Sequence, residues 1–152
     1  MLSWLTLTND ADVPIAGLLS WIKSPSTASR FYPAGFSNEL NVAASRYAGS
    51  TTNRVINMDQ GAVIATDGNL PFAVTNLVRL SASSTISVTP GSGCTMALDR
   101  TSGRFSGSFR IPGTTTVRTF YGSLLQNADE GYGHFLGTNQ SGQIHFVPVS
   151  QP

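Results

Sequence analysis

The chain has 152 residues, a length that fits one domain with a single core. Only 11% of the residues are charged, and the formal net charge is +1, so no basic surface is expected for a run of phosphates and nucleic acid is not an expected partner. The single cysteine, Cys94, excludes an intramolecular disulfide and a thiolate metal cage, and no apolar run approaches the roughly 20 residues of a membrane span.

The predicted elements are almost all β-strands. Short apolar and β-branched runs, bounded by Gly, Pro, Asn, Asp and Ser, indicate strands at 2–8, 17–23, 54–58, 62–66, 73–80, 84–89, 95–99, 104–111, 119–125, 133–138 and 143–149. The stretch 39–47 is either a short helix or a loop followed by an edge strand. We therefore predict an all-β fold over residues 1–152, an antiparallel meander that forms a barrel or a sandwich.

One hairpin pattern occurs twice. In residues 17–32 and again in 103–121, a strand opened by glycine is followed by a turn with proline and by a return segment with a Phe-Tyr pair. An internally duplicated hairpin, whose glycines let strands bend and approach closely, favours a sheet that curls toward closure. In the second copy, alternation places Phe105, Gly107 and Phe109 on the core face, so Gly107→Val is expected to overfill the interior.

Two long segments carry a family resemblance. "LSWLTLTNDADVPIAGLLSWIKSPSTASRFYPAGF" and "TSGRFSGSFRIPGTTTVRTFYGSLLQNADEGYGHFLGTNQSGQIHFVP" resemble the β-rich C-terminal domain of large exported proteins from Verrucomicrobia, Planctomycetes and related environmental bacteria. The resemblance implies an extracellular or cell-surface setting and no agreed activity, although the first residues do not have the pattern of a signal peptide. Related domains have further strands before the segment that matches residues 2–8, so the resemblance implies an N-terminally truncated domain.

A missing strand has a physical consequence for assembly. A sheet that lacks neighbouring strands leaves an edge with unpaired N–H and C=O groups. We therefore expect this edge to pair with a second copy in a homodimer, or with strands of a larger parent protein.

The two histidines are the first candidates for chemistry. A two-residue turn at Asn139–Gln140 would place His134 directly opposite His145 on one face of a hairpin. Such a pair could supply a general base with its orienting partner, or two metal ligands, and a separate Ser/His/Asp arrangement could join His134 and Asp129 to Ser106, Ser108 or Ser123. A polar pair on the solvent side of the hairpin is the favoured interpretation, because a paired face supplies no third group.

Carboxylates and aromatic rings give two further candidate sites. Asp10 and Asp12 in "NDADVP" have the oxygen ligands that suit Ca²⁺, although the same spacing is ordinary turn chemistry, and no other cofactor is expected. A second set consists of aromatic residues that could stack on a sugar or an acyl chain if they are exposed: Trp4, Trp21, Tyr32 and Tyr121.

These observations favour a non-catalytic binding or assembly module. The alternative is a small hydrolase of esters or lactones, assisted by Ca²⁺ and holding an acyl chain in a barrel mouth. A second alternative is a strand-completing oligomerisation piece. If His134, His145 and an acidic loop meet at one concave opening, the hydrolase is favoured, whereas a histidine pair on a flat exposed sheet favours binding.

Overall fold

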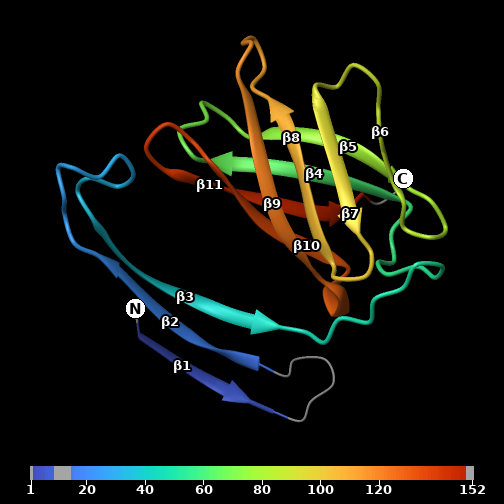
Figure 1. Ribbon diagram of the computed structural model, residues 1–152, viewed down its shortest axis with the longest axis horizontal. Helices are drawn as coiled ribbons and strands as arrows, with labels where there is room; N and C mark the ends of the chain where they lie inside the picture. Colours follow the sequence, from blue (N-terminus) through green and yellow to red (C-terminus); the bar gives the residue numbers. More distant parts are fainter. Residues whose placement is uncertain (1, 9–14, 150–152) are drawn as a thin grey trace. The chain divides into compact units, whose positions relative to one another are not determined.

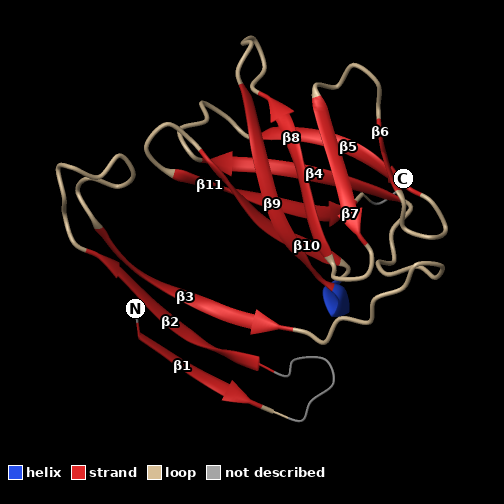
Figure 2. Ribbon diagram, viewed as in Figure 1, coloured by secondary structure: helices blue, strands red, loops and turns tan. Residues whose placement is uncertain are grey.

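The computed structural model describes residues 2–8 and 15–149, and in this part of the chain β-strands predominate (Figures 1 and 2). The strands are β1 (Leu2–Leu7), β2 (Ile15–Lys23), β3 (Phe36–Ala44), β4 (Gln60–Asp67), β5 (Val74–Leu80), β6 (Ile86–Val88), β7 (Cys94–Asp99), β8 (Arg104–Arg110), β9 (Val117–Leu125), β10 (Glu130–Leu136) and β11 (Ser141–Pro148). A single 3-10 turn, η1 (Gln126–Ala128), joins β9 to β10 and is the blue element in Figure 2. The predicted all-β class is confirmed.

The strands form two antiparallel sheets. One has the order β1-β2-β3, and the other has the order β6-β5-β4-β11-β10-β9-β8-β7. The contacts divide the chain into two compact units, residues 1–46 and 47–152, and each sheet belongs to one unit. The single domain that the sequence favours stays a prediction.

The eight-stranded sheet curls into a nearly closed barrel (Figure 1). Its two edge strands, β6 and β7, are consecutive in the chain and approach each other without ladder pairing. Both predicted hairpins form, as β2–β3 and as β8–β9. They differ in one respect, because the Phe-Tyr pair lies in the return strand of the second hairpin, whereas Phe31 and Tyr32 lie in the loop of the first.

Phenylalanine rings fill the interior of the barrel. Five of them are almost completely buried: Phe105, Phe109, Phe120, Phe135 and Phe146. Four of these rings lie opposite a glycine of the neighbouring strand, in the pairs Phe105–Gly122, Phe120–Gly107, Phe135–Gly142 and Phe146–Gly131. Large rings beside positions without side chains let the strands curve tightly at full packing density. A Cβ on Gly107 would overlap the Thr95 carbonyl and the Phe120 ring, as the sequence predicts.

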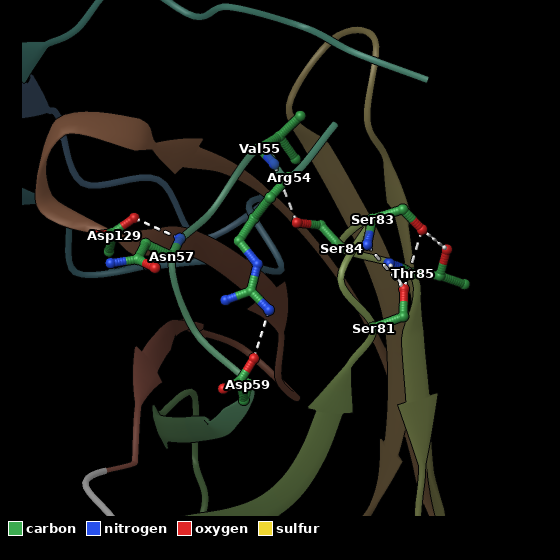
Figure 3. A network of polar contacts seen from close by, with 9 residues as sticks. All are labelled: Arg54, Val55, Asn57, Asp59, Ser81, Ser83, Ser84, Thr85 and Asp129. Carbon is green, nitrogen blue, oxygen red and sulfur yellow. Dashed lines mark hydrogen bonds and ion pairs between the residues drawn. The ribbon is translucent and has the colours of Figure 1, made fainter. Parts of the chain in front are cut away.

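The stretch 54–58, which the sequence predicts as a strand, joins no ladder. Val55, Ile56 and Met58 are nevertheless buried in the core. Figure 3 shows how side chains bind its backbone, because the Val55 N–H donates to Ser84 Oγ at 3.0 Å and the Asn57 N–H donates to Asp129 Oδ1 at 2.7 Å. Three side chains of the segment are buried, and its Val55 and Asn57 N–H groups bond to side chains instead of a neighbouring strand.

The three-stranded sheet has no core of its own among the described residues. None of the described side chains of β1, β2 and β3 is fully buried, and Trp4 is 84% exposed. β3 forms an edge of this sheet, so 39–47 contains an edge strand and no helix, but the order is the reverse of the predicted one: the strand ends at Ala44 and residues 45–47 follow it without regular structure.

Candidate functional site

A groove runs over the outer face of β7 to β10, opposite the phenylalanine core. Its volume is about 710 Å³. Its floor includes Gly122 and Gly133, which pair with each other and contribute only backbone. The polar and aromatic side chains around it alternate with the buried ones along each strand: Asp99, Arg104, Ser106, Tyr121, Ser123, Tyr132 and His134. Strand alternation therefore places the core and the groove on opposite sides of the same strands.

Most polar groups of the groove have no protein partner. Within the described part of the chain, no hydrogen bond or ion pair engages the side chains of Arg104, Ser106, Tyr121, Ser123 or His134. Tyr121 is 55% exposed and Tyr132 is 51% exposed. Donors without protein partners, next to exposed ring faces, are available to a ligand.

Asp99, in contrast, is fully engaged by its own turn. Its carboxylate accepts hydrogen bonds from Thr101 Oγ1 at 2.6 Å, from the Thr101 N–H at 2.9 Å and from Ser102 Oγ at 2.7 Å. These hydrogen bonds, the Thr101 hydroxyl first, hold the pKa of Asp99 far below its ordinary value. Asp99 is thus ionised near neutral pH and fixed in position.

Beside the groove, Glu130, Tyr132 and His145 form a cluster. The Tyr132 hydroxyl donates to Glu130 Oε2, and His145 Nε2 lies 3.2 Å from the same oxygen. The rings of Tyr132 and His145 stack with centroids 4.7 Å apart. The hydrogen bond from Tyr132, followed by that from His145, lowers the pKa of Glu130, and the bond to Glu130 raises the pKa of Tyr132. The cluster fixes the Tyr132 ring at the wall of the groove.

The predicted pairing of the two histidines is wrong. The register places His134 opposite Gln143, and His145 faces Tyr132. The Gly137 N–H bonds to the Gln140 carbonyl at 2.8 Å, so the hairpin turns at residues 138 and 139 and not at 139 and 140. His134 and His145 still share the outer face, offset by two positions, but only His134 lines the groove.

A smaller hollow of about 330 Å³ adjoins the groove, and Tyr121 and His134 line both. Arg118 also borders this second hollow, but it pairs with the core residue Phe109 and alternates with Tyr121, so its side chain is on the core side of β9. Its guanidinium has one weak contact, 3.5 Å to Thr138 Oγ1, and its Nε is buried without a hydrogen-bond partner.

The four aromatic candidates belong to two units: Trp4, Trp21 and Tyr32 to residues 1–46, and Tyr121 to residues 47–152. Trp21 and Tyr32 both contact the Phe36 ring edge-on, at centroid distances of 5.3 and 5.0 Å. Trp4 pairs with Leu18, three positions from Trp21 on β2, so the two tryptophans are on opposite faces of their sheet. Tyr121 alone belongs to the groove.

The acidic candidates have separate positions. Asp129 accepts the hydrogen bond from the Asn57 backbone, and the carboxylate that contacts His145 is its neighbour Glu130. Asp10 and Asp12 lie outside the described residues. Among the described residues, no three His, Cys, Asp or Glu side chains gather in a group that could hold a metal ion.

Sequence reasoning missed Arg104, Glu130 and Tyr132 as members of the site. The signal was present in the alternation, because a strand with Phe105 on the core face has Arg104 on the other face, and the same period in β9 and β10 assigns Ser123 and Tyr132 to that face.

Comparisons with protein families, with curated proteins and with solved structures find no match to this chain. No helix of the described residues is long and apolar enough to cross a membrane.

Proposed function

We propose that the chain is a non-catalytic binding module whose groove takes a carbohydrate. One observation carries this proposal: Tyr121 and Tyr132, on adjacent strands, are half-exposed and line the same groove. The register makes them diagonal neighbours, about 7–8 Å apart, which is within reach of one ring-containing ligand. Aromatic faces stack on apolar ring surfaces, while a polar rim binds hydroxyl groups.

The polar rim favours a sugar over an acyl chain. Pockets for apolar ligands are lined mainly by hydrophobic side chains with few polar groups. Here the rim carries the hydroxyls of Ser106, Tyr121 and Ser123 without protein partners. A hydroxyl-rich ligand can exchange its bonds to water for bonds to these groups.

The setting that we propose is an exported bacterial protein at the cell surface or outside the cell. The resemblance of residues 2–36 and 101–148 to domains of such proteins supports this setting. The low content of charged residues, 11%, is consistent with it.

The test is direct binding of soluble glycans, measured by titration calorimetry and affinity electrophoresis. Tyr121→Ala and Tyr132→Ala should each weaken binding by about tenfold, because each removes a stacking face. Phe72→Ala, which removes a comparably exposed ring outside the groove, is the matched control and should bind like the wild type. A folded wild-type protein that binds no glycan would refute the proposal.

A hydrolase of esters or lactones is the second candidate, and the contact of Glu130 with His145 favours it. A carboxylate that orients an imidazole is one part of a general-base arrangement. Turnover of short- or long-chain esters or lactones that is lost in Glu130→Gln and His145→Ala would replace the binding proposal. Parallel assays with Ca²⁺ and with chelator test the assistance of the ion.

Assembly through the three-stranded sheet is the third candidate. β1 is an edge of this sheet, and its Trp4 and Leu7 are 84% and 78% exposed. Open edges and exposed apolar side chains promote association with a second copy or with strands of a parent protein. Sedimentation that changes with protein concentration would support a homodimer, and Trp4→Ser should then shift it toward the monomer.

A further inference from the structure

We infer that the groove binds a neutral sugar chain with free adjacent hydroxyl groups, and that the Arg104 guanidinium holds one such pair of hydroxyls. This inference rests on the proposed carbohydrate function and names the class of ligand. Its basis is the position of Arg104, which has Asp99 on one neighbouring strand and the strands of the two exposed tyrosines on its other side.

The two charged side chains that line the groove balance each other. The ladder of β7 and β8 places Asp99 directly opposite Arg104, on the same face of the sheet. The Asp99 carboxylate is ionised near neutral pH. An anion bound by Arg104 would therefore lie inside the Debye length, about 8–10 Å, of this negative charge. Repulsion from Asp99 offsets attraction by Arg104, so the pair gives no preference for an acidic ligand.

The guanidinium of Arg104 nevertheless keeps its hydrogen-bond donors. The Asp99 carboxylate accepts its hydrogen bonds from Thr101 and Ser102. Within residues 2–8 and 15–149, no ion pair or hydrogen bond engages the Arg104 side chain. A guanidinium has five N–H donors in a planar fork, which suits two acceptor oxygens side by side. Carboxylate, sulfate and adjacent hydroxyls all offer such oxygens, and hydroxyls are favoured because an anion loses far more hydration on binding.

The tyrosines are placed to carry the ring that bears these hydroxyls. Arg104 is opposite Ser123, and Ser123 is opposite Tyr132, so two strand intervals, about 10 Å, separate Arg104 from Tyr132. Tyr121 lies two positions along β9 from Ser123 and is therefore a diagonal neighbour of both Arg104 and Tyr132. A sugar ring that stacks on Tyr121 thus has the Arg104 guanidinium within reach of its hydroxyl edge.

The linkage of a sugar chain decides whether adjacent hydroxyls are free. A 1,4-linked galactan has free O2 and O3 on every ring, and these two hydroxyls are adjacent. A 1,3-linked galactan has free O2, O4 and O6 on its internal rings, and no two of them are adjacent. The two polymers have the same sugar and no charge, so they differ in the feature that Arg104 is inferred to bind.

The test compares three soluble glycans of matched chain length: a 1,4-linked galactan, a 1,3-linked galactan and polygalacturonate, which is 1,4-linked and acidic. Calorimetry gives the affinities of the wild type, Arg104→Met and the control Arg79→Met, which removes an exposed arginine of β5 outside the groove. We expect the wild type to bind the 1,4-linked galactan about tenfold more tightly than the 1,3-linked one. Arg104→Met should lose this preference, and Arg79→Met should keep it.

Polygalacturonate tests the charge balance. It should bind no more tightly than the 1,4-linked galactan, and its affinity should change little between 50 and 500 mM NaCl. Because Arg104 is exposed and its side chain has no hydrogen bond to the described residues, Arg104→Met should fold like the wild type.

Three results would overturn the inference and leave the carbohydrate function standing. The first is binding of the 1,3-linked galactan by the wild type that equals or exceeds binding of the 1,4-linked one. The second is a preference for the 1,4-linked galactan that persists in Arg104→Met. The third is tighter, salt-sensitive binding of polygalacturonate. Absence of binding to all three glycans by folded protein would overturn both the inference and the carbohydrate function.

Discussion

Phe105 of β8 lies directly opposite Gly122 of β9, and its ring occupies the space where a side chain of Gly122 would begin. The two residues fit together as a large and a small member of one cross-strand pair. Because Phe105 is 2% exposed, its ring has no route into solvent. The pair sets how closely β8 and β9 curve around the core.

Gly122→Ala should destabilise the barrel by about 1–3 kcal/mol, since its methyl group would overlap the Phe105 ring and the Tyr132 carbonyl. Gly131→Ala is the matched comparison, because its nearest atoms are side-chain ends, beginning 2.7 Å away on Phe105, and no backbone atom blocks it. Urea unfolding of both variants measures the difference. Equal losses of stability would contradict the role assigned to the backbone carbonyl.

Ser84→Ala should cost about 1–3 kcal/mol, because the buried Val55 N–H would lose its acceptor. Ser83→Ala is the control, since its hydroxyl contacts only the hydroxyls of Ser81 and Thr85 and its loss should stay within about 0.5 kcal/mol. The measurement is the free energy of unfolding of the Ser84→Ala and Ser83→Ala variants, each compared with the wild type. A Ser84 variant as stable as the Ser83 variant would show that the 54–58 segment does not depend on this bond.

Acid should weaken the fold partly through Asp99. Its folded-state pKa is depressed by the hydroxyls of Thr101 and Ser102, so its contribution is present above the unfolded pKa of about 4 and is lost as the pH falls below it. Asp99→Asn should therefore flatten the decline of the urea midpoint between pH 4 and pH 2. Thr101→Val should flatten it as well, whereas Thr101→Ser keeps the hydroxyl and should follow the wild type. An unchanged slope in Asp99→Asn would exclude this source of acid sensitivity.

Tyr132→Phe should raise the pKa of Glu130, because the hydroxyl of Tyr132 is the main group that stabilises the carboxylate. The chain has only two glutamates, Glu39 and Glu130, so carbon-13 NMR titration of their carboxyl groups resolves the change. Tyr121→Phe, on the neighbouring strand, is the control and should leave the Glu130 titration as it is. A Glu130 pKa that does not move in Tyr132→Phe would mean that the hydrogen bond is absent in solution.

Local sequence patterns predicted the strands well and failed where distant residues decide. The stretch 36–44 contains helix-forming residues such as Glu39 and Leu40, but pairing with β2 makes it a strand. The segment 54–58 has strand-like composition, yet Ser84 and Asp129 supply its hydrogen bonds from elsewhere in the chain. Neither partner is visible in the neighbouring sequence.

The histidine register failed for a similar reason. Asn69 accepts hydrogen bonds from the N–H groups of Thr138 and Asn139, at 3.1 and 3.2 Å, and this contact spans about 70 positions in the chain. It accompanies a turn at residues 138 and 139 in place of the predicted turn at 139 and 140. Moving the turn by one residue shifts the register by two positions, which keeps both histidines on the outer face but removes their pairing, so the face was predictable and the partner was not.

The alternation along β8, β9 and β10 also separates positions that tolerate substitution during evolution from positions that do not. Every second position faces phenylalanine and glycine neighbours that tolerate little change, whereas the positions between them face the groove and pack against nothing inside. Substitutions at Arg104, Tyr121 or His134 can alter what is bound without disturbing the interior. A register shift of one residue in these strands would move every core-facing side chain to the groove and every groove-facing side chain to the core. The close packing of the interior therefore also fixes which side chains line the groove.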